Sequence, residues 1–151
     1  MELQKIDPSV QAIQDYMVEN NHVDGIFGDG KSIANSPDVA IKHSFADQVY
    51  IRQMNLKKDY VIVGAIHNHL HAWFLLTGEI TVITENKKEH FLAPCYVVST
   101  PGVKRVIYAN KESIFVNIHK NPSNTEDLNK LEADIVSKNY QEYENYINQK
   151  K

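Results

Sequence analysis

Between Phe45 and His119, short runs of β-branched and aromatic residues alternate with turn residues, and this pattern constrains the fold more than any other feature of the chain. The interruptions recur about every 8–12 residues, which is typical of a β-sandwich or barrel. The sequence therefore predicts a mainly β core over residues 45–119. Its predicted strands are residues 49–54, 60–66, 73–84, 90–93, 96–99, 105–108 and 114–118.

Helical periodicity replaces the strand pattern on both sides of this core. Asp7 can cap a helix whose first residue is Pro8, and apolar residues then recur at helical spacing, so we predict an amphipathic helix over residues 8–19. After the strands, Ser123 and Glu126 match a capping box, and we predict helices over residues 124–148. This tail carries a tyrosine-rich stripe that fits either packing or an oligomer contact.

Length and charge narrow the class of protein. The 151 residues contain no linker and no repeat, so residues 1–151 are expected to form a single domain. The net charge of −3 argues against a nucleic-acid partner, which needs a concentrated basic surface. No stretch approaches roughly 18 apolar residues, so no membrane span is expected. The chain begins without a secretory apolar run and has Cys95 as its one cysteine, which together predict a cytoplasmic protein.

The segment from Gly25 to Ser32 matches the phosphate-loop pattern G-x-x-x-x-G-K-[ST]. That loop needs a buried strand before it and a helix that starts at its Lys-Ser end. Here a predicted helix precedes the segment, and Pro37 soon breaks any helix that follows it. We interpret the segment as a glycine-rich connection into the β core rather than as a nucleotide site.

Three histidines, His67, His69 and His71, alternate at the end of a predicted strand. In an extended chain such residues face the same side. Imidazole is the commonest metal ligand in proteins, and a divalent metal needs several neutral nitrogens that converge on it. The pattern therefore favours a metal site, and a polar loop whose histidines only form hydrogen bonds is the alternative.

Around these histidines the chain resembles the cupin superfamily, whose first motif is a His-x-His pair followed by a glutamate and then by a glycine turn. Gly78 is similar to the closing glycine of that motif. In this register His71 takes the place of the glutamate and His67 that of the second histidine. The place of the first histidine falls on Ala65, whereas a slipped alignment makes His67 and His69 the pair.

The second cupin motif, P-x-G-x-x-H-x-x-x-N, resembles the segment from Pro101 to Arg105, which lacks the residue between proline and glycine. Arg105 stands where the family has a metal-binding histidine. The resemblance spans residues 45–119 and implies a mainly β, single cupin-type jelly roll with an N-terminal helix and a C-terminal helical tail. The chain is also similar to small cupin-like proteins encoded by bacteriophages and bacteria, in segments such as 43–46, 93–94, 99–105 and 118–119. For a phage-encoded chain the expected compartment is the host cytoplasm.

A jelly roll adds a further histidine to the candidate site. Its last strand is expected to pair antiparallel with the strand that starts near His71, which brings His119 beside His71. We therefore expect an open site of His67, His71 and His119, with His69 as an alternative ligand or as support for the others. For His119 the alternative is a histidine that only caps a backbone carbonyl. The expected cofactor is a divalent metal ion (Fe, Zn, Mn or Ni), with open positions for water or substrate.

Arg105 is expected to point inward, where a buried guanidinium needs an anionic partner. That partner is either an internal acid such as Glu79 or the carboxylate or phosphate of a bound small molecule. Trp73, Glu79 and Tyr108 are further candidates for ligand contacts, with a core position as the alternative for Trp73. Two functions fit these residues: a metal-dependent enzyme acting on a small molecule, or a non-catalytic ligand-binding or structural module. Exposed edge strands and the resemblance both suggest a homodimer.

Overall fold

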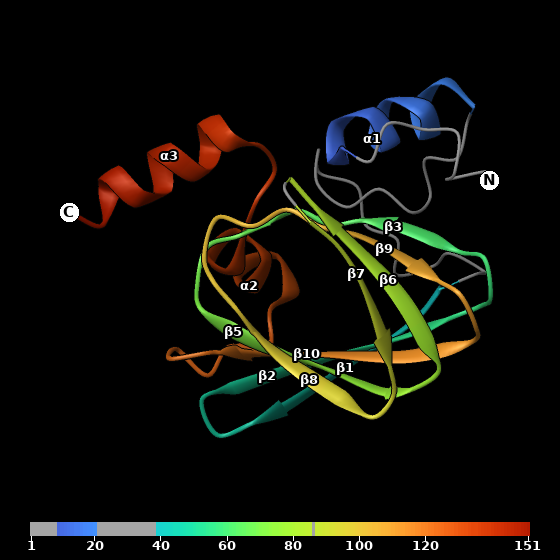
Figure 1. Ribbon diagram of the computed structural model, residues 1–151. Helices are drawn as coiled ribbons and strands as arrows, with labels where there is room; N and C mark the ends of the chain where they lie inside the picture. The colour runs from blue at the N-terminus through green and yellow to red at the C-terminus, as the bar shows by residue number, and fades with distance from the viewer. Residues whose placement is uncertain (1–8, 21–38, 86) are drawn as a thin grey trace.

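The computed structural model describes residues 9–20, 39–85 and 87–151, which form a mainly β structure with helices near both ends. Two sheets face each other as a jelly roll (Figure 1). The elements in chain order are α1 (Val10–Glu19), β1 (Val39–Ala46), β2 (Val49–Leu56), β3 (Val61–Val63), β4 (Ile66–His67), β5 (His71–Thr77), β6 (Glu79–Thr84), β7 (Lys87–Leu92), β8 (Cys95–Ser99), β9 (Val106–Ala109), β10 (Ser113–Lys120), α2 (Leu128–Ile135), β11 (Val136–Ser137) and α3 (Tyr140–Gln149).

The larger sheet has the strand order β1-β2-β10-β5-β8, and the smaller sheet has the order β3-β9-β6-β7. Alternate residues of β5 and β10 face inward, because successive side chains of a strand point to opposite faces. Trp73 from β5 lies at the centre of the core, where it stacks on Phe115 and meets the edge of Phe91, each at a centroid distance of 5.0 Å. Aromatic pairs with these geometries stabilise a core beyond the area they bury.

Gly78 corrects the prediction of one strand over residues 73–84. The chain turns at this glycine, where φ is +93°, so that β5 joins the larger sheet and β6 the smaller one. A hydrogen bond from the Glu79 amide to Ser113 Oγ, 3.1 Å long, holds the corner against the start of β10. Glycine adopts a positive φ without steric cost, which explains why the corner forms here.

Several predicted boundaries also change. The β structure begins at Val39 rather than at Phe45, since β1 pairs with β2 over its whole length. Helix α1 begins after Ser9, whose side chain accepts a hydrogen bond from the Ala12 amide, so the predicted cap at Asp7 is wrong. The residues before Ser9 and the phosphate-loop-like segment 25–32 lie outside the described residues.

The helices pack on different parts of the jelly roll. Helix α1 lies on the outer face of the smaller sheet, where Ile13 and Met17 contact apolar side chains of β3, β6 and β9 (Figure 1). Helix α2 packs Leu131 and Ile135 against Tyr50 of β2. Its N-cap is Asp127, so the predicted capping box that starts at Ser123 is wrong.

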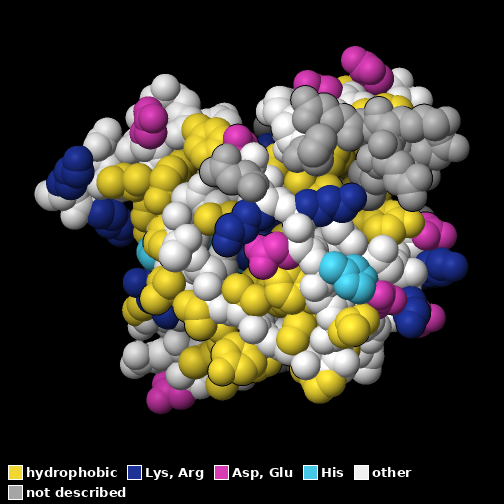
Figure 2. All heavy atoms as spheres, viewed as in Figure 1, with side chains coloured by type: hydrophobic (Ala, Val, Ile, Leu, Met, Phe, Trp, Pro, Cys, Tyr) yellow, Lys and Arg dark blue, Asp and Glu magenta, His cyan; other side chains and the backbone are white. Residues whose placement is uncertain are grey.

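Helix α3 extends away from the sheets (Figure 1), and none of its residues is buried. Among the described residues no helix is long and apolar enough to cross a membrane. On the face shown in Figure 2, hydrophobic side chains gather over the lower part of the molecule, where β8 runs. Tyr96 and Val98 of β8 are among the exposed apolar residues.

Candidate metal centre

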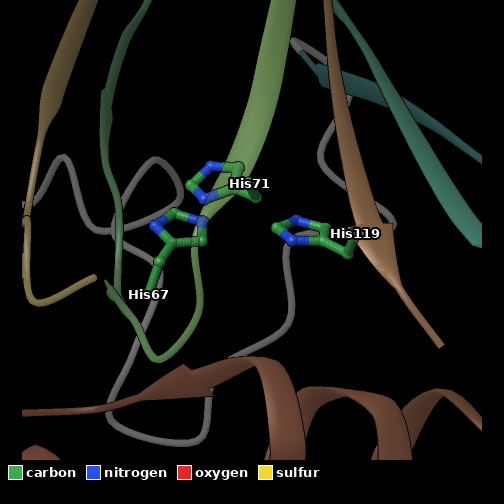
Figure 3. Close-up of side chains that lie close together, drawn as sticks. All are labelled: His67, His71 and His119. Carbon is green, nitrogen blue, oxygen red and sulfur yellow. The ribbon is translucent and has the colours of Figure 1, made fainter. Parts of the chain in front are cut away.

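Three strands bring His67, His71 and His119 together inside the jelly roll (Figure 3). Strand β10 pairs antiparallel with β5, and the pairing of Ile118 with Ala72 leaves His119 and His71 side by side on the inner face. His67 comes from β4, which pairs with β11, the short strand after α2. His119 therefore lies close to His71, as expected from antiparallel pairing of the two strands.

The three imidazoles are close enough to share a ligand. One nitrogen from each ring lies within 4.8 Å of the corresponding nitrogens of the other two. The ring centroids of His67 and His71 are 4.2 Å apart, those of His71 and His119 4.7 Å, and those of His67 and His119 5.6 Å.

Burial keeps all three rings neutral at pH 7, because a protonated imidazole is poorly solvated inside the protein. It lowers the pKa of His71 to about 4, and the neighbouring Arg105 charge adds to this effect. Burial, followed by the proximity of His71, lowers the pKa of His119 to about 2. The pKa of His67 also lies well below its ordinary value, from burial and then from Arg105. Neutral imidazoles have the free lone pairs that metal ions need.

Arg105 lies next to this cluster, with 5% of its surface exposed. Its Nη1 donates to Ser99 Oγ at 2.8 Å, and its Nη2 lies 3.2 Å from His71 Nε2. Because guanidinium has only donors, His71 Nε2 must be the acceptor, which places the ring proton on Nδ1, 3.4 Å from the His69 carbonyl. Burial lowers the pKa of Arg105 to about 10, so it remains charged at neutral pH.

The expected pairing of Arg105 with Glu79 is wrong. Glu79 forms ion pairs with His90 at 2.7 Å and Lys111 at 3.3 Å, near the Gly78 corner. Among the described residues, no carboxylate lies within ion-pair distance of Arg105. Arg105 is therefore a buried cation whose polar partners are a hydroxyl and an imidazole.

The other candidate residues lie outside the histidine cluster. His69 is bound instead by Tyr146 of α3, whose hydroxyl lies 2.8 Å from His69 Nε2. Tyr108 donates a 2.5 Å hydrogen bond to Asp59 and packs beside the residues that contact α1. Trp73 belongs to the central core, where 2% of its surface is exposed.

A cavity of about 240 Å³ opens beside the histidines. His67, His119 and Arg105 form part of its wall, and α2 covers it with residues that include Leu131 and Glu132. This volume lies below the roughly 300–1,000 Å³ of typical ligand pockets, so it limits a ligand to a few heavy atoms.

Sequence reasoning missed several polar residues in this wall, among them Tyr50, Arg52 and Asn117. The Tyr50 ring stacks on His119 at 6.1 Å, and its hydroxyl lies 2.6 Å from Nδ1 of His43. Burial raises the pKa of Tyr50 and lowers that of Arg52. The spacing of Tyr50 and Arg52 could have indicated their place in the wall, because residues two apart on a strand share a face.

The donor set fits a divalent transition metal. Nδ1 of His67 is buried and has no hydrogen-bond partner among the described residues, which is costly unless something else binds it. Neutral imidazole nitrogens suit Zn, Fe, Ni and Cu, and Mn binds mixed nitrogen and oxygen sets. One feature opposes binding: the His71 lone pair that a metal would need already accepts a hydrogen bond from Arg105.

Comparisons with known proteins identify the fold. No protein-family model and no curated protein sequence matches the chain. A solved cupin superfamily protein from Desulfitobacterium hafniense matches with a TM-score of 0.51 and 12% identity, covering 58% of this chain and 81% of that one. An RmlC-like cupin from Shewanella frigidimarina matches with a TM-score of 0.51 and 14% identity, covering 62% and 82%.

A cupin 2 conserved barrel domain protein from Leptotrichia buccalis matches with a TM-score of 0.52 and 18% identity, covering 61% of this chain and 46% of that one. The fold is therefore a cupin-type jelly roll, as the resemblance implied. Likeness at this level of identity concerns the fold and leaves the chemistry to the residues of the site.

Proposed function

We propose that this protein binds a divalent transition-metal ion between His67, His71 and His119, and a small molecule in the adjoining cavity. The observation that carries the proposal is the convergence of three buried, neutral imidazoles within 4.8 Å. Structural histidines in a core normally satisfy their nitrogens with hydrogen bonds, whereas His67 Nδ1 has none among the described residues.

The residues around the cluster favour an anionic small molecule. Arg105 lines the cavity beside His67 and His119, and a buried guanidinium binds carboxylate or phosphate oxygens in a fixed geometry. A metal held by His67, His71 and His119 would keep open coordination positions and would supply Lewis-acid chemistry there. Positioning this molecule is the role that we propose for Arg105 and the cavity wall.

Metal analysis of the purified protein tests this proposal. We expect near-stoichiometric Fe, Zn, Mn or Ni after equilibration with each ion and removal of the excess, and loss of that metal in a His67→Ala, His71→Ala double variant. His90→Ala is the matched control, because His90 is half-exposed and pairs with Glu79 away from the cluster. A protein that retains no metal under any of these conditions contradicts the proposal.

The absence of an acid near Arg105 among the described residues favours a second candidate function. In this alternative the protein is a non-catalytic module that uses Arg105 and the neutral histidines to hold an anionic ligand without metal. Phosphate or a carboxylate would then raise the melting temperature of metal-free protein, and Arg105→Gln would remove that effect. The metal analysis separates the two functions, because the double variant loses metal only if the first is correct.

A further inference from the structure

A second cavity, of about 400 Å³, lies on the other side of Arg105, between the β6–β7 hairpin and β8. Its apolar wall includes Trp73, Phe91 and Val97, and exposed charged residues of β7 stand at its rim. Strands β7 and β8, which both contribute residues to this cavity, are labelled in Figure 1. Its volume lies within the range of small-molecule binding sites, which are mostly apolar with a few fixed polar groups.

Arg105 is the one described side chain that lines both cavities. Its Nη1 binds Ser99, which belongs to the wall of the second cavity, while its Nη2 binds His71 in the candidate metal centre. The guanidinium thus forms part of the partition between the two spaces. A ligand that reaches it from the second cavity acts on a group that also contacts the histidine cluster.

We propose that the second cavity binds a small carboxylate with an apolar or aromatic body, and that this carboxylate draws Arg105 away from His71 and so frees the imidazole for metal binding. The second half of this inference rests on the proposed metal function. The first half, the carboxylate site, stands independently of it.

The class of ligand follows from the surroundings of Arg105. Guanidinium has five N–H donors, of which the hydrogen bonds to Ser99 and His71 use two, leaving three for a ligand. A carboxylate binds such a group through two parallel hydrogen bonds and neutralises its buried charge. The half-buried Phe91 offers the body of the ligand an aromatic surface, and the edge of the cavity next to it is formed by the buried Trp73. Acetate alone leaves that wall empty, and a neutral ligand leaves the charge of Arg105 unpaired.

The coupling follows from the single lone pair of a neutral imidazole. His71 Nε2 accepts the Arg105 hydrogen bond at 3.2 Å, so metal and guanidinium compete for the same ring. The positive charge of Arg105 opposes a divalent cation as well. A carboxylate that binds Arg105 relieves both effects, and by linkage the metal must then strengthen carboxylate binding by the same factor.

Trp73 makes the carboxylate site directly observable, since it is the only tryptophan of the chain and lines the second cavity. We expect phenylacetate to change its fluorescence saturably in metal-free protein, while phenylacetamide and acetate, which lack the charge and the apolar body respectively, bind far more weakly. Arg105→Gln is expected to weaken phenylacetate binding at least about tenfold, because it removes a charge-assisted bidentate contact. Val97→Phe fills the cavity and leaves Arg105 and His71 unchanged, so it tests the site even if Arg105→Gln does not fold.

The coupling is measured as the affinity for Zn²⁺, by competition with a chromophoric chelator, with and without saturating phenylacetate. We expect phenylacetate to tighten Zn²⁺ binding about fivefold or more in the unmodified protein and to have no effect in Val97→Phe. Absence of a saturable fluorescence change, or equal phenylacetate binding by Val97→Phe, overturns the carboxylate site. Unchanged Zn²⁺ affinity overturns the coupling. If the protein binds Zn²⁺ neither with nor without phenylacetate, the proposed metal function is overturned. The fluorescence result still decides the carboxylate site in that case.

Discussion

Replacing Gly78 by alanine is expected to destabilise the protein more than the same change at Gly102, although both glycines have a positive φ, +93° and +85°. An added Cβ at Gly78 meets the backbone of β10, with Ser113 Cα at 2.7 Å and the Glu112 carbonyl oxygen closer still. At Gly102 the nearest atoms belong to the side chain of Tyr143 on α3, the closest being its hydroxyl oxygen at 3.0 Å.

The expected magnitudes follow from these two environments. A positive φ costs a residue with a Cβ roughly 1–2 kcal/mol, and this contribution is common to both variants. Overpacking against a fixed backbone adds about 1–3 kcal/mol, which applies to Gly78 only, because the exposed helix α3 can shift. We therefore expect losses of about 2–5 kcal/mol for Gly78→Ala and about 1–2 kcal/mol for Gly102→Ala, against a total stability of roughly 5–15 kcal/mol for a domain.

Urea denaturation followed by far-ultraviolet circular dichroism measures both losses, provided that the slope of the transition stays constant between variants. Equal losses would refute the argument, because both variants would then show the common φ cost alone and the backbone contact at the corner would contribute nothing. A larger loss at Gly102 would show instead that α3 is held more rigidly than its exposure indicates.

Three further perturbations test the site and its supports. In chelator-treated protein His71 is expected to contribute about 3 kcal/mol to the fall in the free energy of unfolding between pH 6.5 and pH 4, since the unfolded chain protonates His71 near its ordinary pKa of 6.5 and the folded chain only at about 4. The lowered pKa values of His67 and His119 add to this fall in the same direction. Urea titrations at several pH values check the His71 contribution, and a His71→Asn variant whose stability falls as steeply as that of the unmodified protein would contradict it. Ser137→Ala leaves the buried Asn68 Oδ1 without its 2.6 Å hydrogen bond, which we expect to cost about 1–3 kcal/mol in the same urea assay. Tyr146→Phe removes the hydroxyl that binds His69 at 2.8 Å, and it is expected to cost about 0.5–1.5 kcal/mol and to increase proteolysis of the tail, whereas an unchanged cleavage rate would show that this contact does not hold α3.

Most of the strand pattern could be predicted because it depends on local sequence. Runs of β-branched residues and their turns gave the strands of both sheets, and antiparallel pairing then placed His119 beside His71. The strand pattern missed the corner at Gly78, since the apolar residues continue through it, and only the resemblance to the glycine turn of the first cupin motif indicated it. Strand β1 was missed for the opposite reason, because Lys42 and His43 interrupt its apolar alternation.

The partners of the candidate site were harder to predict than its members. Three histidines at alternating positions suggested one ligand set, but Tyr146 of α3 binds His69 instead. Arg105 was expected beside Glu79, whereas the turn at Gly78 places Glu79 near His90 and Lys111. Such choices depend on contacts between segments far apart in the chain, which residue spacing alone does not encode.

The pairing of β4 with β11 has a consequence for the order in which the protein folds. Strand β4 carries His67, and its one partner among the described strands is β11, which lies beyond α2; the neighbouring contact between Asn68 and Ser137 joins residues 69 positions apart. Residues 136–137 follow β10 in the chain, so during synthesis the pairing of β11 with β4 cannot form until the chain beyond α2 has been made. A newly made chain therefore brings His71 and His119 together through β5 and β10 before residues 136–137 can hold His67 in place. A cation that binds at that stage would meet two imidazoles, and the pairing of β11 with β4 would then bring His67 to complete the set around it.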